Sequence, residues 1–190
     1  MKSTLVTAAF ITLISTAGYS QTWNWDKAHS QLNFGVTHLS ISEIDGSFGS
    51  VTAKITSTKD DLSDAVVELT AEVASISTGV EQRNNHLKSP DFFDAAKYPT
   101  LTFKSTSFKK TGAKTYEVTG DLTLHGVTKP VVLTATLNGT TVNPQSKKTI
   151  AGWKVTGTIK RTDFGIAAGF PSAMLGDDVA LNANAEFVKD

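Results

Sequence analysis

Apolar and polar residues alternate with a period of two along almost the whole chain after about residue 20, which is typical of β-strands with one buried face. The pattern predicts eight strands. Their apolar-face residues, in chain order, are Leu32, Phe34, Val36 and His38; Val51, Ala53 and Ile55; Val67, Leu69, Ala71 and Val73; Leu101 and Phe103; Tyr116, Val118, Leu122 and Leu124; Val131, Leu133, Ala135 and Leu137; Trp153, Val155 and Ile159; and Val179, Leu181, Ala183, Ala185 and Phe187.

The connections predict how these strands pair. Turn residues separate them at Asp45-Gly46, Thr111-Gly112, His125-Gly126, Asn143-Pro144 and Gly176-Asp177. Apart from one insertion, no connection is long enough for a crossover helix, so we expect an antiparallel sheet. Glycines inside the strands, at Gly35, Gly120 and Gly157, favour closure into a barrel, with a two-sheet sandwich as the alternative.

The insertion lies between the third and fourth predicted strands, where residues 81–103 lose the alternation. Ser89 is a suitable N-cap and Pro90 suits the first helical position, so a short helix is predicted that ends before Tyr98-Pro99. Arg83 and His86 precede it on an earlier helical turn. Two interpretations remain open: a plug that fills one end of the barrel, or a lid that contacts a ligand.

An eight-stranded barrel is either filled by its own side chains or able to hold one small ligand. Small residues recur on the predicted inner faces, namely Ala53, Ala71, Ala135, Ala183 and Ala185. They leave more room than leucine or isoleucine would, and we therefore expect a cavity.

Residues 1–20 have the pattern of a secretory signal peptide, with one lysine, an apolar run and small residues at the expected cleavage site. Residues 21–190 then form one domain, periplasmic or secreted, with 17 basic against 18 acidic residues and no membrane-spanning segment. This balance predicts no nucleic-acid partner. The chain has no cysteine, which excludes thiol catalysis and cysteine-based zinc sites.

Few residues suggest reaction chemistry. The four histidines are dispersed, so no metal is predicted, and no phosphate loop or nucleophile motif indicates a cofactor or a catalytic residue. His38 lies on an apolar face, either as a core histidine bonded to the backbone or as a ligand contact. Arg161 follows an apolar strand, where it can pair with Asp163 or hold a polar head group.

Several motifs in order resemble the YceI-like family of secreted bacterial proteins, also called polyisoprenoid-binding proteins. The resemblance runs from about Trp25 to Val188. Its landmarks are Trp25 to Gln31 enclosing Asp26, His29 and Ser30; Phe34-x-Val36-x-His38-Leu39; Gly46-x-Phe48-Gly49; Ser75 to Gly79; Arg83-x-x-His86-Leu87-Lys88-Ser89; Asp91 to Asp94; Tyr98-Pro99; Thr102 to Ser105; Gly120 to Pro130; and Arg161-x-Asp163-Phe164-Gly165-Ile166.

The resemblance implies a lipocalin-like barrel whose apolar lumen takes an isoprenoid lipid, a quinone or another long amphiphile, with the aromatic insertion beside the pocket. It implies no catalysis, and it makes a homodimer an expectation. One departure is Asn84, where the family usually has Asp. Loss of that carboxylate would remove an ion pair with Arg83 and free the arginine for a head group.

The sequence thus predicts a non-enzymatic binding protein for a long-chain amphiphile, acting in transport, storage or stress response. The predicted lumen residues are Phe34, Val36, His38, Phe92, Phe93, Tyr98, Phe103, Leu122, Trp153 and Phe164, with Arg83, His86 and Arg161 as head-group candidates. The alternatives are a partner-binding module with a self-filled barrel and an enzyme that acts on a lipid or quinone through His38 or His86.

Overall fold

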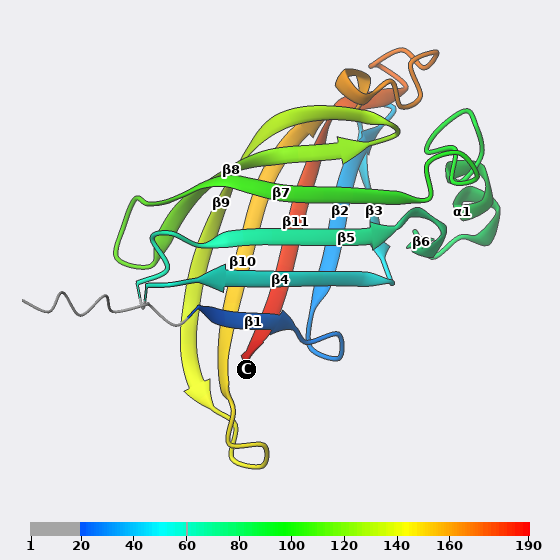
Figure 1. Ribbon diagram of the computed structural model, residues 1–190. Coiled ribbons are helices and arrows are strands. Elements are labelled where there is room, and N and C mark those ends of the chain that lie inside the picture. The colour runs from blue at the N-terminus through cyan, green and yellow to red at the C-terminus, as the bar shows by residue number, and fades with distance from the viewer. Residues whose placement is uncertain (1–19, 60) are drawn as a thin grey trace, which may run out of the picture.

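Eight strands close into a ring in the computed structural model, which describes residues 20–59 and 61–190 (Figure 1). The strand order is β1-β4-β5-β7-β8-β9-β10-β11, and β1 also pairs with β11. The ring strands are β1 (Gln21–Trp25), β4 (Val51–Ser57), β5 (Val66–Glu72), β7 (Thr100–Lys110), β8 (Thr115–Leu124), β9 (Val127–Val142), β10 (Thr149–Lys160) and β11 (Leu175–Lys189). Neighbouring strands of the ring run antiparallel, so the predicted eight-stranded antiparallel barrel is confirmed.

Three further strands extend this sheet beyond the ring. They are β2 (Gln31–His38), which pairs with the first part of β11, then β3 (Ser42–Phe48) and β6 (Ile76–Ser77). The first predicted strand is therefore β2, outside the ring, and β1 takes the eighth ring position. β1 is only five residues long, too short for alternation to reveal it, yet it pairs Trp23 with Ile55 and Trp25 with Phe187.

Two of the predicted turns are wrong. Asp45-Gly46 lies inside β3, where Gly46 packs under an aromatic ring: a Cβ at Gly46 would lie 2.2 Å from the ring of Phe34. The chain reverses instead at Leu39 and Ser40, whose φ angles are 51° and 59°.

The second wrong turn, Gly176-Asp177, lies inside β11, between Leu175 and Val179, where the register with β2 shifts. The real connection between β10 and β11 is longer and includes the 3₁₀ helix η2 (Arg161–Phe164). The other three predicted turns do separate consecutive strands, at residues 111–112, 125–126 and 143–144.

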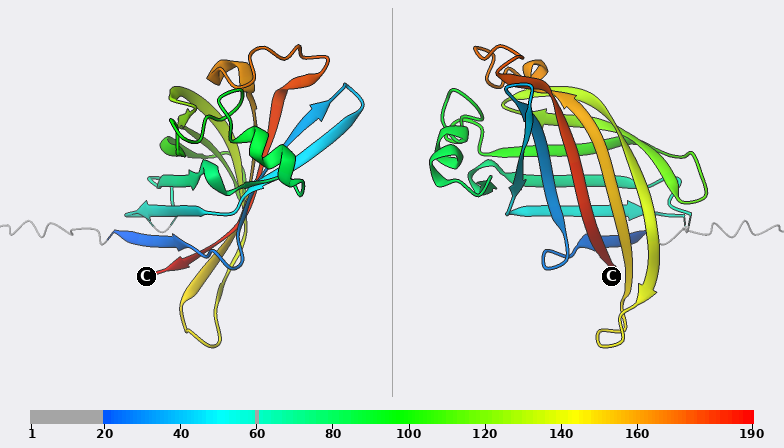
Figure 2. Two further views of the ribbon diagram at one scale, coloured as in Figure 1. Left: turned by 90° about the vertical axis from the view of Figure 1, so that its right-hand side faces the viewer. Right: turned by 180° about the vertical axis from the view of Figure 1, so that it is seen from behind.

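The barrel is flattened, so that it has two faces. The strands β1, β4, β5 and β7 cross one face, while β9, β10, β11 and β2 run steeply across the other (Figures 1 and 2). The insertion with the 3₁₀ helix η1 (Val73–Ser75) and the helix α1 (Glu81–Leu87) lies at one side, and η2 with the loop that follows lies at an adjacent end. Across the two described stretches of chain, no helix combines the length and apolarity needed to cross a membrane.

The predicted helical turn with Arg83 and His86 is present as α1. The helix predicted to start at Ser89 and end before Tyr98 does not form, and residues 88–98 form turns instead. Asp94 has a φ of 45°, which interrupts a right-handed helix, and its N–H bonds back to the carbonyl of Ser89. The helical start signals at Ser89 and Pro90 therefore introduce turns that fold back on α1.

Gly120 shows why the barrel needs glycine at crowded positions. A Cβ there would lie 2.5 Å from the ring of Phe103 and 2.6 Å from the backbone carbonyl of Lys104. The carbonyl belongs to the sheet and cannot move aside, so we expect Gly120→Ala to destabilise the protein by about 2 kcal/mol. Thermal unfolding measures the change.

Gly139→Ala is the matched control on the neighbouring strand, because nothing lies within 4 Å of its added Cβ. The two variants should therefore differ clearly in melting temperature. Equal melting temperatures would show that the sheet around Gly120 has more room than the distances indicate.

Candidate functional site

An apolar cavity of about 220 Å³ lies inside the barrel. Both faces contribute to its wall, and so do the insertion and the loop after η2. The lining residues are Trp25, Leu32, Phe34, Val36, Phe48, Ala53, Ile55, Val67, Leu69, Leu87, Phe92, Phe93, Leu101, Phe103, Phe108, Val118, Leu122, Leu124, Val131, Leu133, Ala135, Trp153, Val155, Ile159, Arg161, Ile166, Leu175, Val179, Leu181, Asn182, Ala183, Ala185 and Phe187.

The period-two pattern explains why the wall is apolar. Inward-facing residues of the ring strands alternate with polar residues on the outside, as along β8, where Tyr116, Val118, Leu122 and Leu124 are buried. Alanines line the middle of the wall at Ala53, Ala135, Ala183 and Ala185, which leaves open space between the larger side chains. The predicted link between small inner residues and a cavity thus holds at these four positions.

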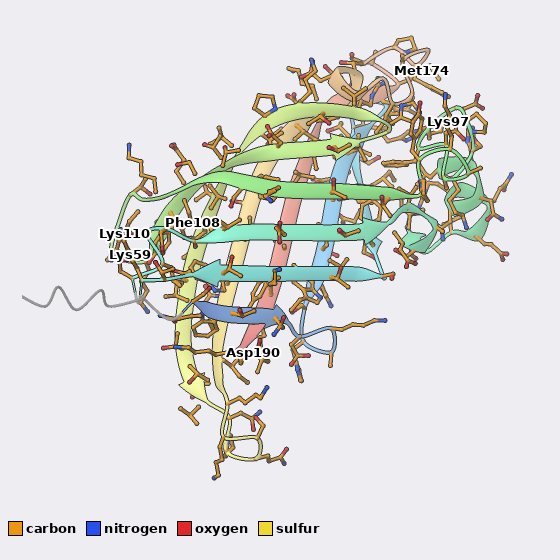
Figure 3. All side chains as sticks on the ribbon, in the orientation of Figure 1. Lys59, Lys97, Phe108, Lys110, Met174 and Asp190 are labelled. Atoms are coloured by element: carbon orange, nitrogen blue, oxygen red, sulfur yellow. The ribbon has the colours of Figure 1, made fainter. Side chains whose placement is uncertain are left out.

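Aromatic side chains close one end of the barrel. The ring of Phe108 lies 4.9 Å from the ring of Tyr116 and 6.0 Å from that of Trp153, measured between centroids. Figure 3 shows Phe108 near one end of the barrel, so the three rings form an aromatic layer there.

The insertion covers the cavity elsewhere. It contributes Leu87, Phe92 and Phe93 to the wall. The Phe93 ring lies 6.2 Å from Phe48 on β3, and the Phe92 ring lies 5.3 Å from Phe170 in the loop after η2. These ring contacts join the insertion to β3 and to the loop after η2, and no residue of α1 itself is fully buried.

Arg161 is the one buried polar side chain among the described lining residues, since Asn182 is exposed. Arg161 is 3% exposed, and its guanidinium donates five hydrogen bonds to backbone carbonyls. The acceptors are the carbonyls of Gly176 (3.0 Å), Ile166 (3.1 Å), Ala167 (2.6 Å), Phe170 (2.8 Å) and Leu175 (2.9 Å).

This pattern uses every N–H of the arginine. Arg161 therefore organises the loop of residues 165–175 around itself. The alternative in which it pairs with Asp163 is wrong, because the ion-pair partner of Asp163 is Lys129, at 3.9 Å. A ligand head group could accept a hydrogen bond from Arg161 only by displacing one of the five carbonyls.

The structure divides the predicted site residues into two groups. It brings eight of them to the cavity wall: Phe34, Val36, Phe92, Phe93, Phe103, Leu122, Trp153 and Arg161. It places the other five away from the wall: His38, Tyr98, Phe164, Arg83 and His86. Ligand contact by any residue of either group stays a prediction.

His38 is exposed at the end of β2, so it is not the core histidine that one interpretation of its apolar face required. Tyr98 and Phe164 belong to a separate cluster around His125. The His125 ring lies 4.7 Å from Tyr98, and its Nδ1 lies 3.0 Å from the carbonyl oxygen of Phe164. This cluster fixes the β8–β9 turn against η2.

Arg83 bonds within the insertion. Its Nε donates to the hydroxyl of Thr78 (2.7 Å), and that hydroxyl donates to Oδ1 of Asn84 (2.8 Å). Asn84 thus supplies a hydrogen-bond acceptor at the position where the family usually has an aspartate. The expectation that Asn84 leaves Arg83 free for a head group is wrong, because Arg83 is bonded to Thr78. His86 lies 3.4 Å from Asp91 and packs its ring on Phe92.

Four aromatic residues of the wall are absent from the predicted lumen residues: Trp25, Phe48, Phe108 and Phe187. Phe187 was placed on a predicted apolar face, and Phe108 lies in β7, whose predicted apolar face named only Leu101 and Phe103. Trp25 and Phe48 lie in strands that were not predicted, β1 and β3. The spacing of Trp23 and Trp25, and of Ile44, Gly46 and Phe48, is the signal that could have found them.

Among the described residues, one group offers three ligand atoms of the kind that metals bind. Asp26, His29 and Glu186 bring these atoms within 4.8 Å of one another. Both carboxylate oxygens of Asp26 already have partners: one accepts a hydrogen bond from the N–H of Ala28 (2.9 Å), and the other lies 2.9 Å from Nδ1 of His29. These hydrogen bonds close the turn between β1 and β2. Whether the group binds a metal is not tested, so the absence of a metal stays a prediction.

The pair of Asp26 and His29 gives a test by pH. The hydrogen bond and charge of Asp26, with Glu186 nearby, raise the pKa of His29 above 6.5, and His29 lowers the pKa of Asp26. A raised histidine pKa stabilises the fold fully below pH 6.5, and this contribution is lost as the pH rises through the folded-state pKa.

NMR titration of the imidazole should therefore show His29 titrating above its ordinary value. Asp26→Asn should bring the pKa of His29 down, because it removes the hydrogen bond and the charge that raise it. A His29 pKa that does not respond to Asp26→Asn would contradict the contact.

Comparison with known proteins agrees with this geometry. The YceI-like domain family matches residues 23–187, nearly the whole described chain. The chain belongs to the YceI-like family. A UPF0312 protein of Pseudomonas savastanoi is 39% identical over 183 residues, covering 93% of this chain and 94% of that protein.

Solved structures support the same fold. The YceI protein of Campylobacter jejuni superposes with a TM-score of 0.74 at 35% identity, covering 81% of this chain and 90% of that one. A polyisoprenoid-binding domain from Saccharophagus degradans superposes with a TM-score of 0.64 at 18% identity, covering 88% of this chain and 98% of that one. The YceI-like barrel predicted from the motifs is confirmed.

Proposed function

We propose that this YceI-like protein binds a long-chain amphiphile, such as a polyisoprenoid, an isoprenoid quinone or a fatty-acid-like lipid, inside the barrel. The observation that carries the proposal is the cavity wall, which is apolar apart from Arg161 and the exposed Asn182. A wall of this kind recognises hydrocarbon by burial and shape. The polyisoprenoid-binding domain of S. degradans, similar in fold, is in keeping with such a ligand.

The energetics favour a chain rather than a compact polar molecule. Each methylene moved from water into the cavity contributes about 0.8 kcal/mol. Ten carbons would contribute about 8 kcal/mol, which corresponds to micromolar affinity only if the cost of immobilising the chain is modest. Few polar contacts are needed, in agreement with a wall whose buried arginine already bonds to five carbonyls.

The size of the cavity bears on how a long ligand would fit. The volume of about 220 Å³ is below the roughly 300–1,000 Å³ of pockets that enclose drug-sized ligands. A long chain would therefore need the cover to move. Residues 81–98 of the insertion are the segment best suited to move, because they form α1 and turns rather than a strand of the ring, and they bring Leu87, Phe92 and Phe93 to the wall.

The proposal assigns a binding role without catalysis. The described cavity wall contains no serine, histidine or carboxylate that could act as nucleophile or general acid and base. Transport or storage in the periplasm or outside the cell, or a part in a stress response, completes the proposal. This location rests on the signal-peptide pattern of residues 1–20, which, apart from Ser20, lies outside the described residues. A homodimer also stays a prediction, which light scattering of the purified protein tests.

Native mass spectrometry tests the function directly. The protein is purified without detergent from the compartment to which it is exported, and the bound material is extracted and identified. We expect a stoichiometric isoprenoid, quinone or fatty amphiphile. A protein that carries nothing and also rejects added farnesol and decyl quinone would contradict the proposal and favour a barrel that binds protein partners.

A further inference from the structure

Three large apolar side chains are exposed together where the β2–β3 turn meets the loop after η2. Leu39 is 48% exposed, Ile41 84% and Met174 49%. We call these three residues the apolar tip. The β2–β3 hairpin projects from the barrel beside the loop (Figure 2), and Met174 lies at the outer end of the molecule (Figure 3).

Hydrogen bonds hold the two segments of the tip together. The N–H of Leu39 donates to the carbonyl of Met174 (2.9 Å), and the hydroxyl of Ser40 donates to the carbonyl of Ala173 (3.4 Å). Behind them, Arg161 fixes the same loop through the carbonyls of Phe170 and Leu175. The exposed side chains are thus displayed by an ordered support.

The turn also favours polar residues over the leucine it contains. Leu39 and Ser40 both have positive φ angles, a conformation for which hairpin turns usually use asparagine and glycine. Backbone geometry therefore does not account for an apolar, half-exposed side chain at Leu39.

The tip is continuous with the cavity. Met174 is followed by Leu175, which lines the cavity and pairs with His38 at the end of β2. Val36, two residues before His38, also lines the cavity. The tip is therefore directly connected, along both chain segments, to residues of the cavity wall.

We propose that the apolar tip inserts into the surface of a lipid bilayer and that the hydrophobic ligand passes between bilayer and cavity at this point. The inference rests on the proposed function, because a ligand that fits the apolar wall is scarcely soluble and is collected from membranes. The residues from Leu39 to Ser42 carry no charge, so apolar insertion rather than attraction to anionic lipid is the interaction.

The area of the tip favours a bilayer over a protein partner. A stable protein interface buries about 800 Å² on each side. Leucine, isoleucine and methionine are smaller than aromatic side chains, which bury about 150–250 Å² each, and two of the three are already half covered. Three such side chains on a projecting turn fall well short of a protein interface, whereas loop tips of this size can enter the headgroup region of a membrane.

The experiment compares Leu39→Asn/Ile41→Ser with wild type and with Val142→Ser. Asparagine tolerates the positive φ at position 39, and Ile41 is almost fully exposed, so the double variant should fold. Val142 is 57% exposed at the end of β9, at the opposite end of the molecule, which makes it a matched control (Figure 1). Circular dichroism and melting temperature check the fold of all three proteins.

Two readouts use phosphatidylcholine vesicles, alone or loaded with a fluorescent decyl quinone. We expect the double variant to lose vesicle association by tenfold or more in flotation and to take up the quinone from vesicles at least tenfold more slowly. Farnesol added from ethanol should bind wild type, the double variant and the control equally, because no tip residue lines the cavity.

Vesicle association and uptake that are unchanged in the double variant would overturn the inference. So would a loss of protein self-association with vesicle association unchanged, which would identify the tip as a contact between copies. Failure of wild type to bind farnesol from ethanol would instead contradict the proposed function, so the two failures are distinguishable.

Discussion

Val155→Trp is expected to abolish ligand binding while leaving the barrel folded. Val155 lines the cavity and pairs with Ala135 on β9 and with Ala183 on β11, so small residues flank it on both sides. The indole would occupy the space that these alanines leave open. Excluding about five methylenes of a ligand chain costs about 4 kcal/mol, a loss of several hundredfold in affinity.

Binding of farnesol, measured by isothermal titration calorimetry, gives the result. Lys154→Trp is the matched control, because it adds the same side chain at the neighbouring, outward-facing position of β10. Overpacking at residue 155 should cost no more than about 1–3 kcal/mol of stability. A folded Val155→Trp protein with wild-type affinity would mean that the ligand lies elsewhere.

Arg161→Met is expected to lower the free energy of unfolding by about 3–5 kcal/mol, the loss typical of breaking a buried, hydrogen-bonded charge. Methionine replaces much of the apolar stem but leaves five backbone carbonyls without their donor. Buried acceptors left without a partner each cost about 1–3 kcal/mol, and some of the five regain water as the loop opens. Urea unfolding measures the change.

Lys160→Met is the control for Arg161→Met. Lys160 is the adjacent residue, and its closer ion pair, with Asp178, is exposed on both sides, so the loss should stay within about 1 kcal/mol. The loop of residues 165–175 should also become more susceptible to proteolysis in Arg161→Met only. Similar losses in the two variants would contradict the role of Arg161 as the centre of this loop.

The sequence predicted the barrel because its long strands carry the whole period-two signal. In β8 and β10, inward residues such as Val118 and Trp153 alternate with outward polar residues, and the pattern survives a glycine on the inward face of each strand. β3 was missed for a physical reason. Its inward position Gly46 carries no side chain because the Phe34 ring occupies that space, so Asp45-Gly46 had the composition of a turn.

The site was predicted only in part, because alternation identifies a face but not how far a side chain lies from the centre. His38 is on the same face as Phe34 and Val36, yet the strand has left the barrel by that point and the imidazole is exposed. Arg161 was predicted to face a head group or Asp163. Its actual partners are backbone carbonyls, and no side-chain pattern can reveal those.

Closure of the ring has a consequence for how the chain folds. The first and last strands of the chain pair with each other to close the ring. Trp25 on β1 pairs with Phe187 on β11, and the N–H of Asp190 donates to the carbonyl of Thr22. Contacts between residues this distant in sequence form slowly, because a long loop must be ordered before they contribute. During synthesis the barrel therefore cannot close until its C-terminal strand has left the ribosome, so ring closure follows completion of the chain.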